Sequence, residues 1–245
     1  MILKDIDDKS IEFKMLSNLY NRAKNQKTKD AISKELNMLK AGYEAEKENA
    51  FYLSARLSED KKLLLINDIR IKHNGLVAQI DHIIISRQGI EILESKSSRG
   101  TMTINLDGSI IVKNRNGNTI TLPNPLEQAY RQAEILKSFL RSKELLPKRS
   151  KLFGGTELNI RSGVLINPKT TLTNQTLPDG FYRADSFITL RKRELDSMSL
   201  ASGLKATFTS YSMDEAYLIA NVIINAHEPI TFDYEKKFKM NENFK

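Results

Sequence analysis

The stretch QIDHIIISRQGIEILESKSSRG, residues 79–100, decides the fold of this chain. Two runs rich in isoleucine flank residues 87–89, a pattern typical of two β-strands joined by a tight turn. The same strands carry four ionisable side chains: Asp81, His82, Glu94 and Lys96. In a half-buried strand such groups cost several kcal/mol unless they are paired, solvated or bound to a metal. The hairpin therefore predicts a site that compensates these charges.

Alternation along each strand indicates which side chains share a face. Glu94 and Lys96 continue an isoleucine face, and Asp81 lies on the face of the odd-numbered residues from 77 to 85. If residues 87 and 88 form a two-residue loop, 85 pairs with 90, 83 with 92, 81 with 94 and 79 with 96. Asp81 then lies opposite Glu94, and like charges so opposed favour a cation between them. Magnesium prefers one or two carboxylates with water and phosphate oxygens, which suits this place.

Two other interpretations stay open from the spacing. Gly89 could occupy the left-handed position of a bulged three-residue loop, and His82 would then face Glu94. Alternatively, Asp81 and Lys96 form a plain salt bridge at the end of the sheet. In the first register His82 points away from Asp81, so we expect a packed or hydrogen-bonded histidine.

Outward from the hairpin, the sequence predicts helices and further strands. Apolar spacing over residues 9–58 indicates two helices with a break near residues 25–28. Residues 62–71 and 160–168 have the β-branched composition of strands. Helices are predicted to start at two capping signals: Asn124 with Pro125 and Glu127, and Ser212 with Glu215.

Between residue 100 and Asn124, three short apolar runs are separated by Asp107-Gly108 and Asn116-Gly117, both strong hairpin signals. They predict a small β-meander inserted in the sheet. The order of elements favours an α/β or α+β sandwich around one central sheet.

The composition, 40% hydrophobic and 28% charged, is that of an ordinary soluble globular protein. No run approaches the roughly 20 apolar residues of a membrane helix, and the N-terminus lacks a signal-peptide apolar region, so we expect a cytoplasmic protein. Zero cysteines and only three histidines argue against thiolate and zinc sites, so any metal should sit on oxygen ligands. A net charge of +8 and a pI near 9.4 make a polyanionic partner plausible.

Four separated motifs, in order and sensibly spaced, resemble the NERD domain, the nuclease-related family placed with PD-(D/E)xK nucleases. They are GYEAE at 42–46, QIDHIII at 79–85, GIEILESKSSRG at 89–100 and NPLEQ at 124–128. The resemblance covers about residues 38–145, with GVLIN at 163–167 as a final core strand. There are two departures: Ala45 replaces a frequent second glycine, and Ile80 stands where proline can precede the aspartate.

The resemblance implies a restriction-endonuclease-like core with a metal site. Asp81, Glu94 and the backbone carbonyl of Ser95 would bind Mg²⁺, for which Mn²⁺ is a possible substitute. Lys96 would orient the attacking water or help to deprotonate it. No covalent nucleophile is needed.

The resemblance also implies roles for two helical residues. Glu46 matches the acidic residue of the family's preceding helix and would bind a second cation or a metal-bound water. Gln128 matches the family's glutamine and would hold a phosphate or water. Both have similar neighbours on their helices, because Glu44 and Glu48 flank Glu46, and Gln132 lies one turn beyond Gln128.

We therefore expect a magnesium-dependent deoxyribonuclease, acting in DNA processing or in defence against foreign DNA. The alternatives are a catalytically silent DNA-binding or scaffold module of the same fold, and an RNA-directed nuclease. Because the sequence carries no helicase or kinase motif, a separately encoded helicase or other protein is a plausible partner. A homodimer is equally open.

The chain divides into a predicted N-terminal helical extension (1–37), a nuclease-like core (38–167) and a C-terminal extension packed on the core (168–245). Basic residues near the motifs could steer DNA by phosphate contacts: Lys47, Arg70, Lys72, Arg87 and Arg99. The basic tail, which contains Phe238 and Phe244, suits single-strand binding, but we favour a frayed terminus.

Overall fold

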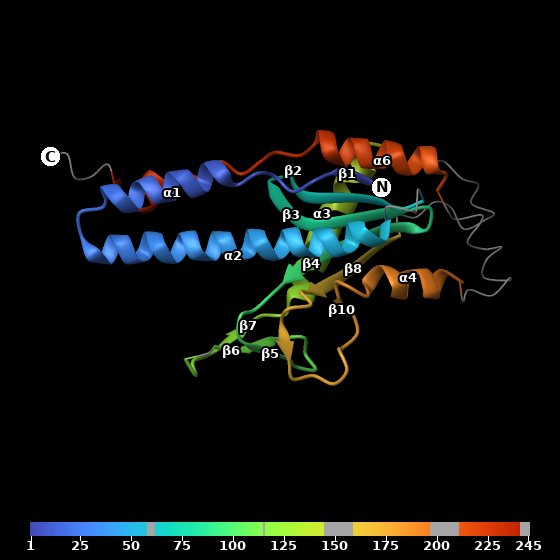
Figure 1. The fold of residues 1–245 in the computed structure, drawn as a ribbon. Coiled ribbons are helices and arrows are strands. Elements are labelled where there is room, and N and C mark those ends of the chain that lie inside the picture. Colours follow the sequence, from blue (N-terminus) through green and yellow to red (C-terminus); the bar gives the residue numbers. More distant parts are fainter. Residues whose placement is uncertain (58–61, 115, 145–158, 197–210, 241–245) are drawn as a thin grey trace.

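The computed structural model describes residues 1–57, 62–114, 116–144, 159–196 and 211–240. Its central sheet has six strands in the order β1-β2-β3-β4-β8-β10 (Figure 1). They are β1 (Ile2–Lys4), β2 (Leu64–His73), β3 (Leu76–Ser86), β4 (Gly89–Lys96), β8 (Ile160–Ile166) and β10 (Phe181–Arg183). β2, β3 and β4 are antiparallel, whereas β1, β8 and β10 each pair in parallel with their neighbour.

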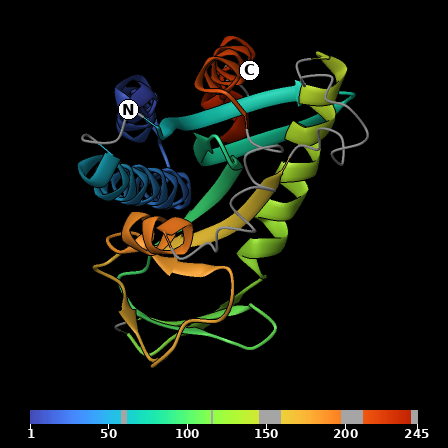
Figure 2. The ribbon, with the colours of Figure 1, turned by 90° about the vertical axis from the view of Figure 1, so that its right-hand side faces the viewer.

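Helices cover both faces of this sheet (Figure 2). α3 (Pro125–Ser142) and α6 (Met213–Asn225) pack on one face, where Ile83 and Ile92 of the hairpin are buried. α2 (Gln26–Leu57) and α4 (Phe187–Asp196) cover the other face, over Ile84 and Leu93. The predicted mixed α/β sandwich is therefore confirmed. No helix in the described ranges is long and apolar enough to cross a membrane.

The two predicted N-terminal helices are α1 (Ser10–Arg22) and α2, which lie side by side and project beyond the sheet (Figure 1). The predicted caps also form, with one difference. Ser212 and Glu215 make a complete capping box at α6, whereas Asn124 accepts a hydrogen bond from the Leu126 backbone at 2.8 Å instead of pairing with Glu127.

The meander was predicted inside the main sheet, and this was wrong. β5 (Thr101–Ile104), β6 (Ile110–Lys113) and β7 (Thr119–Leu122) form a separate four-stranded sheet with β9 (Thr171–Leu172). Only one face of this small sheet is apolar, and it packs on Val164, Ile166 and Phe181 at the ends of β8 and β10. It forms the lower lobe of Figure 1.

The predicted boundaries after residues 37 and 167 do not separate structural units. α2 continues across the first boundary, and β1 makes the N-terminal part an edge strand of the central sheet. β10, beyond the second boundary, forms the opposite edge. Backbone groups of β2 and β8 that would otherwise lie at open edges are thereby paired.

The C-terminal segment is also more ordered than a frayed tail. α7 (Tyr234–Lys237) follows the cap at Asp233, and Tyr234 is buried in a small core with α1 and α2. Lys237 Nζ lies 2.5 Å from Glu35 Oε1, and Phe238 packs on the same core. The favoured interpretation is thus wrong up to residue 240, while Phe244 lies outside the described residues.

Candidate active site

The β3–β4 hairpin has the predicted register up to one point. The pairs run from Ser86–Gly89 through Ile85–Ile90 to His82–Leu93, as a two-residue turn requires. The bulged-loop alternative is therefore wrong. Beyond His82 the pairing stops, and the Ser95 amide donates to Asp81 Oδ2 at 2.7 Å. The expected pairs 81–94 and 79–96 are replaced by this side-chain contact.

A break in strand alternation explains where the pairing stops. Asp68 of β2 lies between the pairs Asn67–His82 and Ile69–Ile80, and its φ of 49° is a left-handed conformation that interrupts the regular ladder. On either side of the break, Ile80 and Ile83 of β3 enter the same core although they are three residues apart. The predicted common face of residues 77–85 is therefore wrong, and Gln79 is exposed.

Glu94 lies at the centre of the site. It is buried, and its Oε1 accepts a hydrogen bond from Lys96 Nζ at 2.6 Å. Gln128 Nε2 donates to Oε2 at 2.9 Å, and Gln132 Nε2 lies 3.5 Å from the same oxygen. Lys96 thus pairs with Glu94, and the plain Asp81–Lys96 salt bridge is not formed. Gln132 was weighed only as a neighbour of Gln128, but its position one helical turn further brings it to the same carboxylate.

His82 holds the hydroxyl group of Ser95 in place. Its buried ring bonds Asn67 Oδ1 through Nδ1 and Ser95 Oγ through Nε2, both at 2.8 Å. Asn49 Nδ2 donates to the same hydroxyl at 3.0 Å. Burial lowers the pKa of His82 to about 3, so the ring is neutral. These contacts confirm the expected packed or hydrogen-bonded histidine.

Two carboxyls of the site, those of Asp81 and Glu46, have a raised pKa. Burial first, and then the charges of Glu94 and Glu46, raise the pKa of Asp81 well above its ordinary value. Burial and the charges of Asp68 and Glu94 raise the pKa of Glu46 to about 7, against the opposing effect of Lys9 and Lys96. Burial and repulsion therefore oppose the simultaneous ionisation of these carboxyls.

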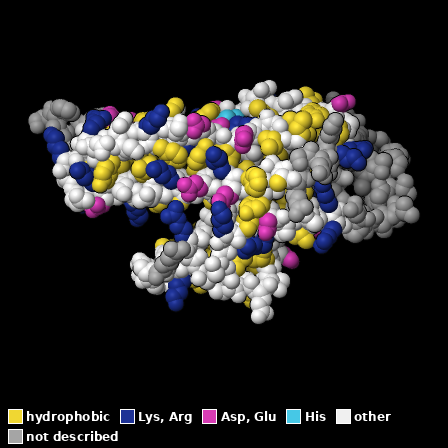
Figure 3. All heavy atoms as spheres, in the orientation of Figure 1, with side chains coloured by type: hydrophobic (Ala, Val, Ile, Leu, Met, Phe, Trp, Pro, Cys, Tyr) yellow, Lys and Arg dark blue, Asp and Glu magenta, His cyan; other side chains and the backbone are white. Residues whose placement is uncertain are grey.

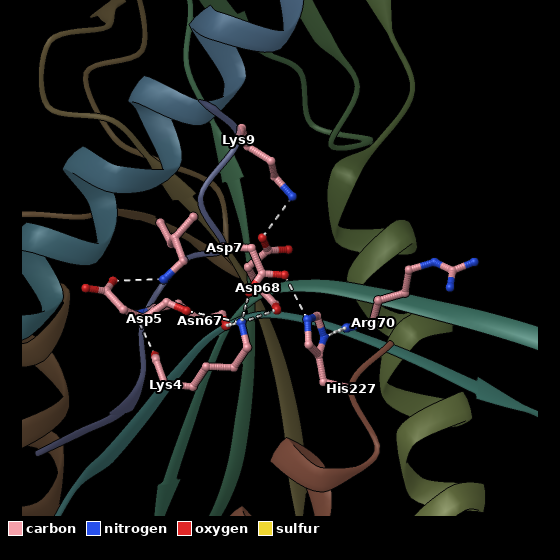
Figure 4. Close-up of polar contacts among 9 residues, drawn as sticks. Lys4, Asp5, Asp7, Lys9, Asn67, Asp68, Arg70 and His227 are labelled. Carbon is pink, nitrogen blue, oxygen red and sulfur yellow. Dashed lines mark hydrogen bonds and ion pairs between the residues drawn. The ribbon is translucent and has the colours of Figure 1, made fainter. Parts of the chain in front are cut away.

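Asp68 was missed from the sequence although it lies within the apolar run LLLINDIRI, residues 63–71. Its side chain is 9% exposed, and Lys9 Nζ lies 3.2 Å from its Oδ2 (Figure 4). The interruption of an apolar strand by a carboxylate was the same signal that drew attention to Asp81. Its partner, in contrast, comes from a segment 59 residues away, which no local pattern indicates.

The N-terminal segment and the region after α6 hold this break in place (Figure 4). Lys4 Nζ donates to the carbonyls of Asn67 and Asp68 at 3.0 and 2.9 Å. His227 accepts the Arg70 amide on Nδ1 at 3.0 Å and bonds Asp7 through Nε2 at 2.8 Å. Residues outside the predicted core thus fix the backbone opposite Asp81.

The side chains of the site provide oxygen ligands of the kind that a hard cation such as Mg²⁺ binds. In the described part of the chain, no group of three or more His, Cys, Asp or Glu side chains is arranged to hold a metal ion alone. Mg²⁺, however, needs only one or two carboxylates, with carbonyl and water oxygens completing its shell. Asp81 and Glu94 are oxygen donors whose mutual repulsion a cation would relieve. The residues present fit such an ion.

The predicted DNA-steering residues do not form one cluster of free charges. Lys72 Nζ pairs with Glu228 at 2.6 Å, and Arg87 Nε donates to the Tyr211 carbonyl at 3.1 Å. Lys47 lies over the Tyr43 ring, whereas Arg99 is exposed. Figure 3 shows lysines and arginines spread over this face of the molecule and along the projecting helices.

Comparison with known families identifies the family of this chain. The sequence model of the nuclease-related domain, NERD, matches residues 41–166, slightly more than half of the chain. This chain belongs to the NERD family. The mixed α/β core is consistent with a nuclease-like fold and with the PD-(D/E)xK group. No curated protein and no solved structure matches the chain.

The NERD segment contains all six residues that were predicted for the site: Glu46, Asp81, Glu94, Ser95, Lys96 and Gln128. The structure gathers them around the end of the β3–β4 ladder. Lys9 and His227, which support the same place, lie outside the NERD segment.

Proposed function

We propose that this NERD protein is a metal-dependent nuclease that hydrolyses phosphodiester bonds of DNA. The observation that carries the proposal is the grouping of Asp81, Glu94 and Lys96 at the point where β3 and β4 stop pairing. Two carboxylates and an ammonium at one such point provide both a place for a cation and a donor for a water molecule.

Asp81, Glu94 and the Ser95 carbonyl are the residues that would hold Mg²⁺. When bound, the ion would stabilise charge on the scissile phosphate and lower the pKa of water. Glu46 would receive a second cation or a metal-bound water, as its place beside the same carboxylates suggests.

The chain's own side chains would orient the reactants. Glu94 holds the Lys96 ammonium through Oε1, and the ammonium's remaining N–H bonds can orient a water toward phosphorus. Gln128 and Gln132 fix the other oxygen of Glu94. With a pKa of about 7, Glu46 can accept or release a proton near neutral pH.

DNA is our preferred substrate because the net charge of +8 favours a polyanion. DNA processing or defence against foreign DNA is the setting that we propose. The charge does not distinguish DNA from RNA, so RNA cleavage is a second outcome of the test. A silent binding module is less favoured because mutually repelling buried carboxylates lower stability without serving binding.

The test is cleavage of supercoiled plasmid, linear duplex, single-stranded DNA and RNA with Mg²⁺, Mn²⁺ or EDTA. We expect metal-dependent cutting of DNA by the wild type and a loss of at least about a hundredfold in Asp81→Asn and Lys96→Ala. Lys113→Ala is a matched control, because Lys113 is an exposed lysine on β6. It should cut as the wild type does.

Melting temperatures of the variants that do not fall below that of the wild type show that a loss of cutting is chemical. If no nucleic acid is cut although DNA binds, the silent module is the better description. If cutting persists in EDTA or in Asp81→Asn, the proposed site is wrong.

A further inference from the structure

A cavity of about 300 Å³ lies beside the candidate active site. Glu46, Asp68 and Gln79 form its wall on the side of the site. Most of the remaining wall comes from residues outside the NERD segment, both before it and after α6. The matched family segment alone therefore does not make this cavity.

Part of the cavity wall is apolar and exposed. Met38 is 62% exposed, Phe232 47% and Ile230 39%. Tyr43 and Tyr234 add two aromatic rings, and the Phe232 and Tyr234 rings have centroids 4.9 Å apart. Large apolar side chains that remain exposed around one cavity mark a place for a ligand.

The polar part of the wall is unsuited to a phosphate. Its carboxylates belong to Glu12, Glu35, Glu46 and Asp68. Among the described residues of this wall the cation is Lys9, and its ammonium already lies against Asp68. An anionic group is therefore disfavoured, whereas the apolar and aromatic part of the wall suits an uncharged ring to whose amino groups Gln79 and the carboxylates offer acceptors.

We propose that the cavity receives one unpaired base of the nucleic-acid strand that is cut. This inference rests on the proposed function, because the cavity shares Glu46 and Asp68 with the site where the phosphate would lie. The volume is at the lower end of ligand pockets, about 300 Å³, and suits a single ring system. A base in a duplex is paired and stacked, so the cavity selects single strands, flaps or frayed ends.

Binding without cleavage tests the cavity directly. The probe is a short DNA strand that carries 2-aminopurine, a base whose fluorescence falls when it stacks on a ring. The strand is used either single-stranded or annealed to its complement. Protein is titrated into each form in the presence of EDTA. The wild type should quench the single strand and bind it at least about fivefold more tightly than the duplex. A single strand with an abasic residue in place of 2-aminopurine should bind less tightly than the 2-aminopurine strand. Its affinity is measured by competition, as the concentration that displaces the fluorescent strand.

Phe232→Ala removes the exposed ring, and Phe51→Ala is the matched control. Phe51 is 64% exposed on α2 and does not line the cavity. Phe232→Ala should lose the quenching and about fivefold or more in affinity for the single strand, whereas Phe232→Tyr and Phe51→Ala should keep both. Equal melting temperatures exclude a folding defect.

Single-strand affinity and quenching that are unchanged in Phe232→Ala would overturn the proposal, as would equal binding of duplex and single strand. Failure of the proposed function has a different result: no substrate is cut in any metal, whatever the binding shows. If duplex and single strand are cut equally well, and Phe232→Ala cuts and binds as the wild type does, the nuclease assignment stands and the base cavity is wrong.

Discussion

Glu94 is the residue on which the site depends, because its carboxylate is buried and accepts hydrogen bonds from several side chains. One of its oxygens receives Lys96, and the other receives Gln128 and Gln132. Its charge also raises the pKa of Asp81. Burial and repulsion therefore oppose the ionisation of Asp81, and ionising it without a cation lowers the stability of the folded protein.

This cost should appear in the pH dependence of stability through Glu46. A carboxyl whose pKa rises from 4.5 to about 7 on folding stabilises the protein below about pH 4.5 and loses that contribution as pH rises through about 7. Without metal, wild-type protein should lose on the order of 2 kcal/mol more than Glu46→Gln between about pH 5 and about pH 8.

Urea unfolding in EDTA at the two pH values measures the difference. Glu44→Gln, an exposed neighbour on the same helix, serves as the control and should keep the wild-type pH dependence. Parallel pH profiles for wild type and Glu46→Gln would show that Glu46 is not a strained carboxyl.

Asp81→Asn should raise the melting temperature in EDTA near pH 8. The amide keeps an oxygen for the Ser95 N–H but removes the charge that Glu94 and Glu46 repel. Mg²⁺ should raise the melting temperature of the wild type and leave that of Asp81→Asn nearly unchanged. Asp185→Asn, which changes an exposed aspartate, should respond to Mg²⁺ as the wild type does; a thermal shift retained in Asp81→Asn would contradict the metal assignment.

At the scale of elements, the break in β2 and β3 creates the site. A regular hairpin would bury Asp81 in its ladder, but the left-handed Asp68 ends the alternation and leaves Asp81 to accept the Ser95 amide. The break is held from two sides by Lys4 and His227. Its geometry therefore depends on contacts that are distant in sequence.

Replacing His227 by alanine should destabilise the protein by about 1–3 kcal/mol, because the Arg70 amide loses its acceptor in a half-buried place. His73→Ala is the matched control, since that histidine bonds only an exposed Ser138 hydroxyl among the polar contacts described for it. Its effect should be clearly smaller. Chemical denaturation measures both, and equal losses would mean that the His227 contact has no special role.

The same break shows how far the sequence could predict the structure. The β3–β4 register followed from a two-residue turn and an isoleucine pattern, both of which are local. The separate sheet of the meander, the strands β1 and β10, and the Lys9–Asp68 pair depend on contacts between distant segments. Propensity and periodicity carry no information on such contacts, and the left-handed Asp68 disrupted the alternation on which the predicted faces relied.

At the scale of the whole molecule, helices cover two faces of the central sheet, and a second small sheet packs on the ends of β8 and β10 (Figure 2). On the face that Figure 3 shows, lysines and arginines are spread out and do not form one patch. Affinity for nucleic acid should thus come from many weak phosphate contacts, while the carboxylates determine where the strand is cut.

Binding of DNA in EDTA should consequently weaken with salt. Raising the salt concentration from about 50 to about 200 mM should lower the affinity at least about tenfold if only two phosphates are neutralised. Fluorescence anisotropy in a salt titration gives the slope. An affinity that does not change with salt would show that the net charge of +8 has no part in binding.

The junction of Lys4, Asp7 and His227 has a consequence for synthesis in the cell. A ribosome completes residues 41–166 well before it reaches His227, so the nascent chain holds every predicted ligand while the β2 break lacks its C-terminal support. Competence to cut should therefore arise only after the segment beyond α6 has emerged and folded back. Under the proposed function, the nucleic acids around the ribosome would be spared until that folding step is complete.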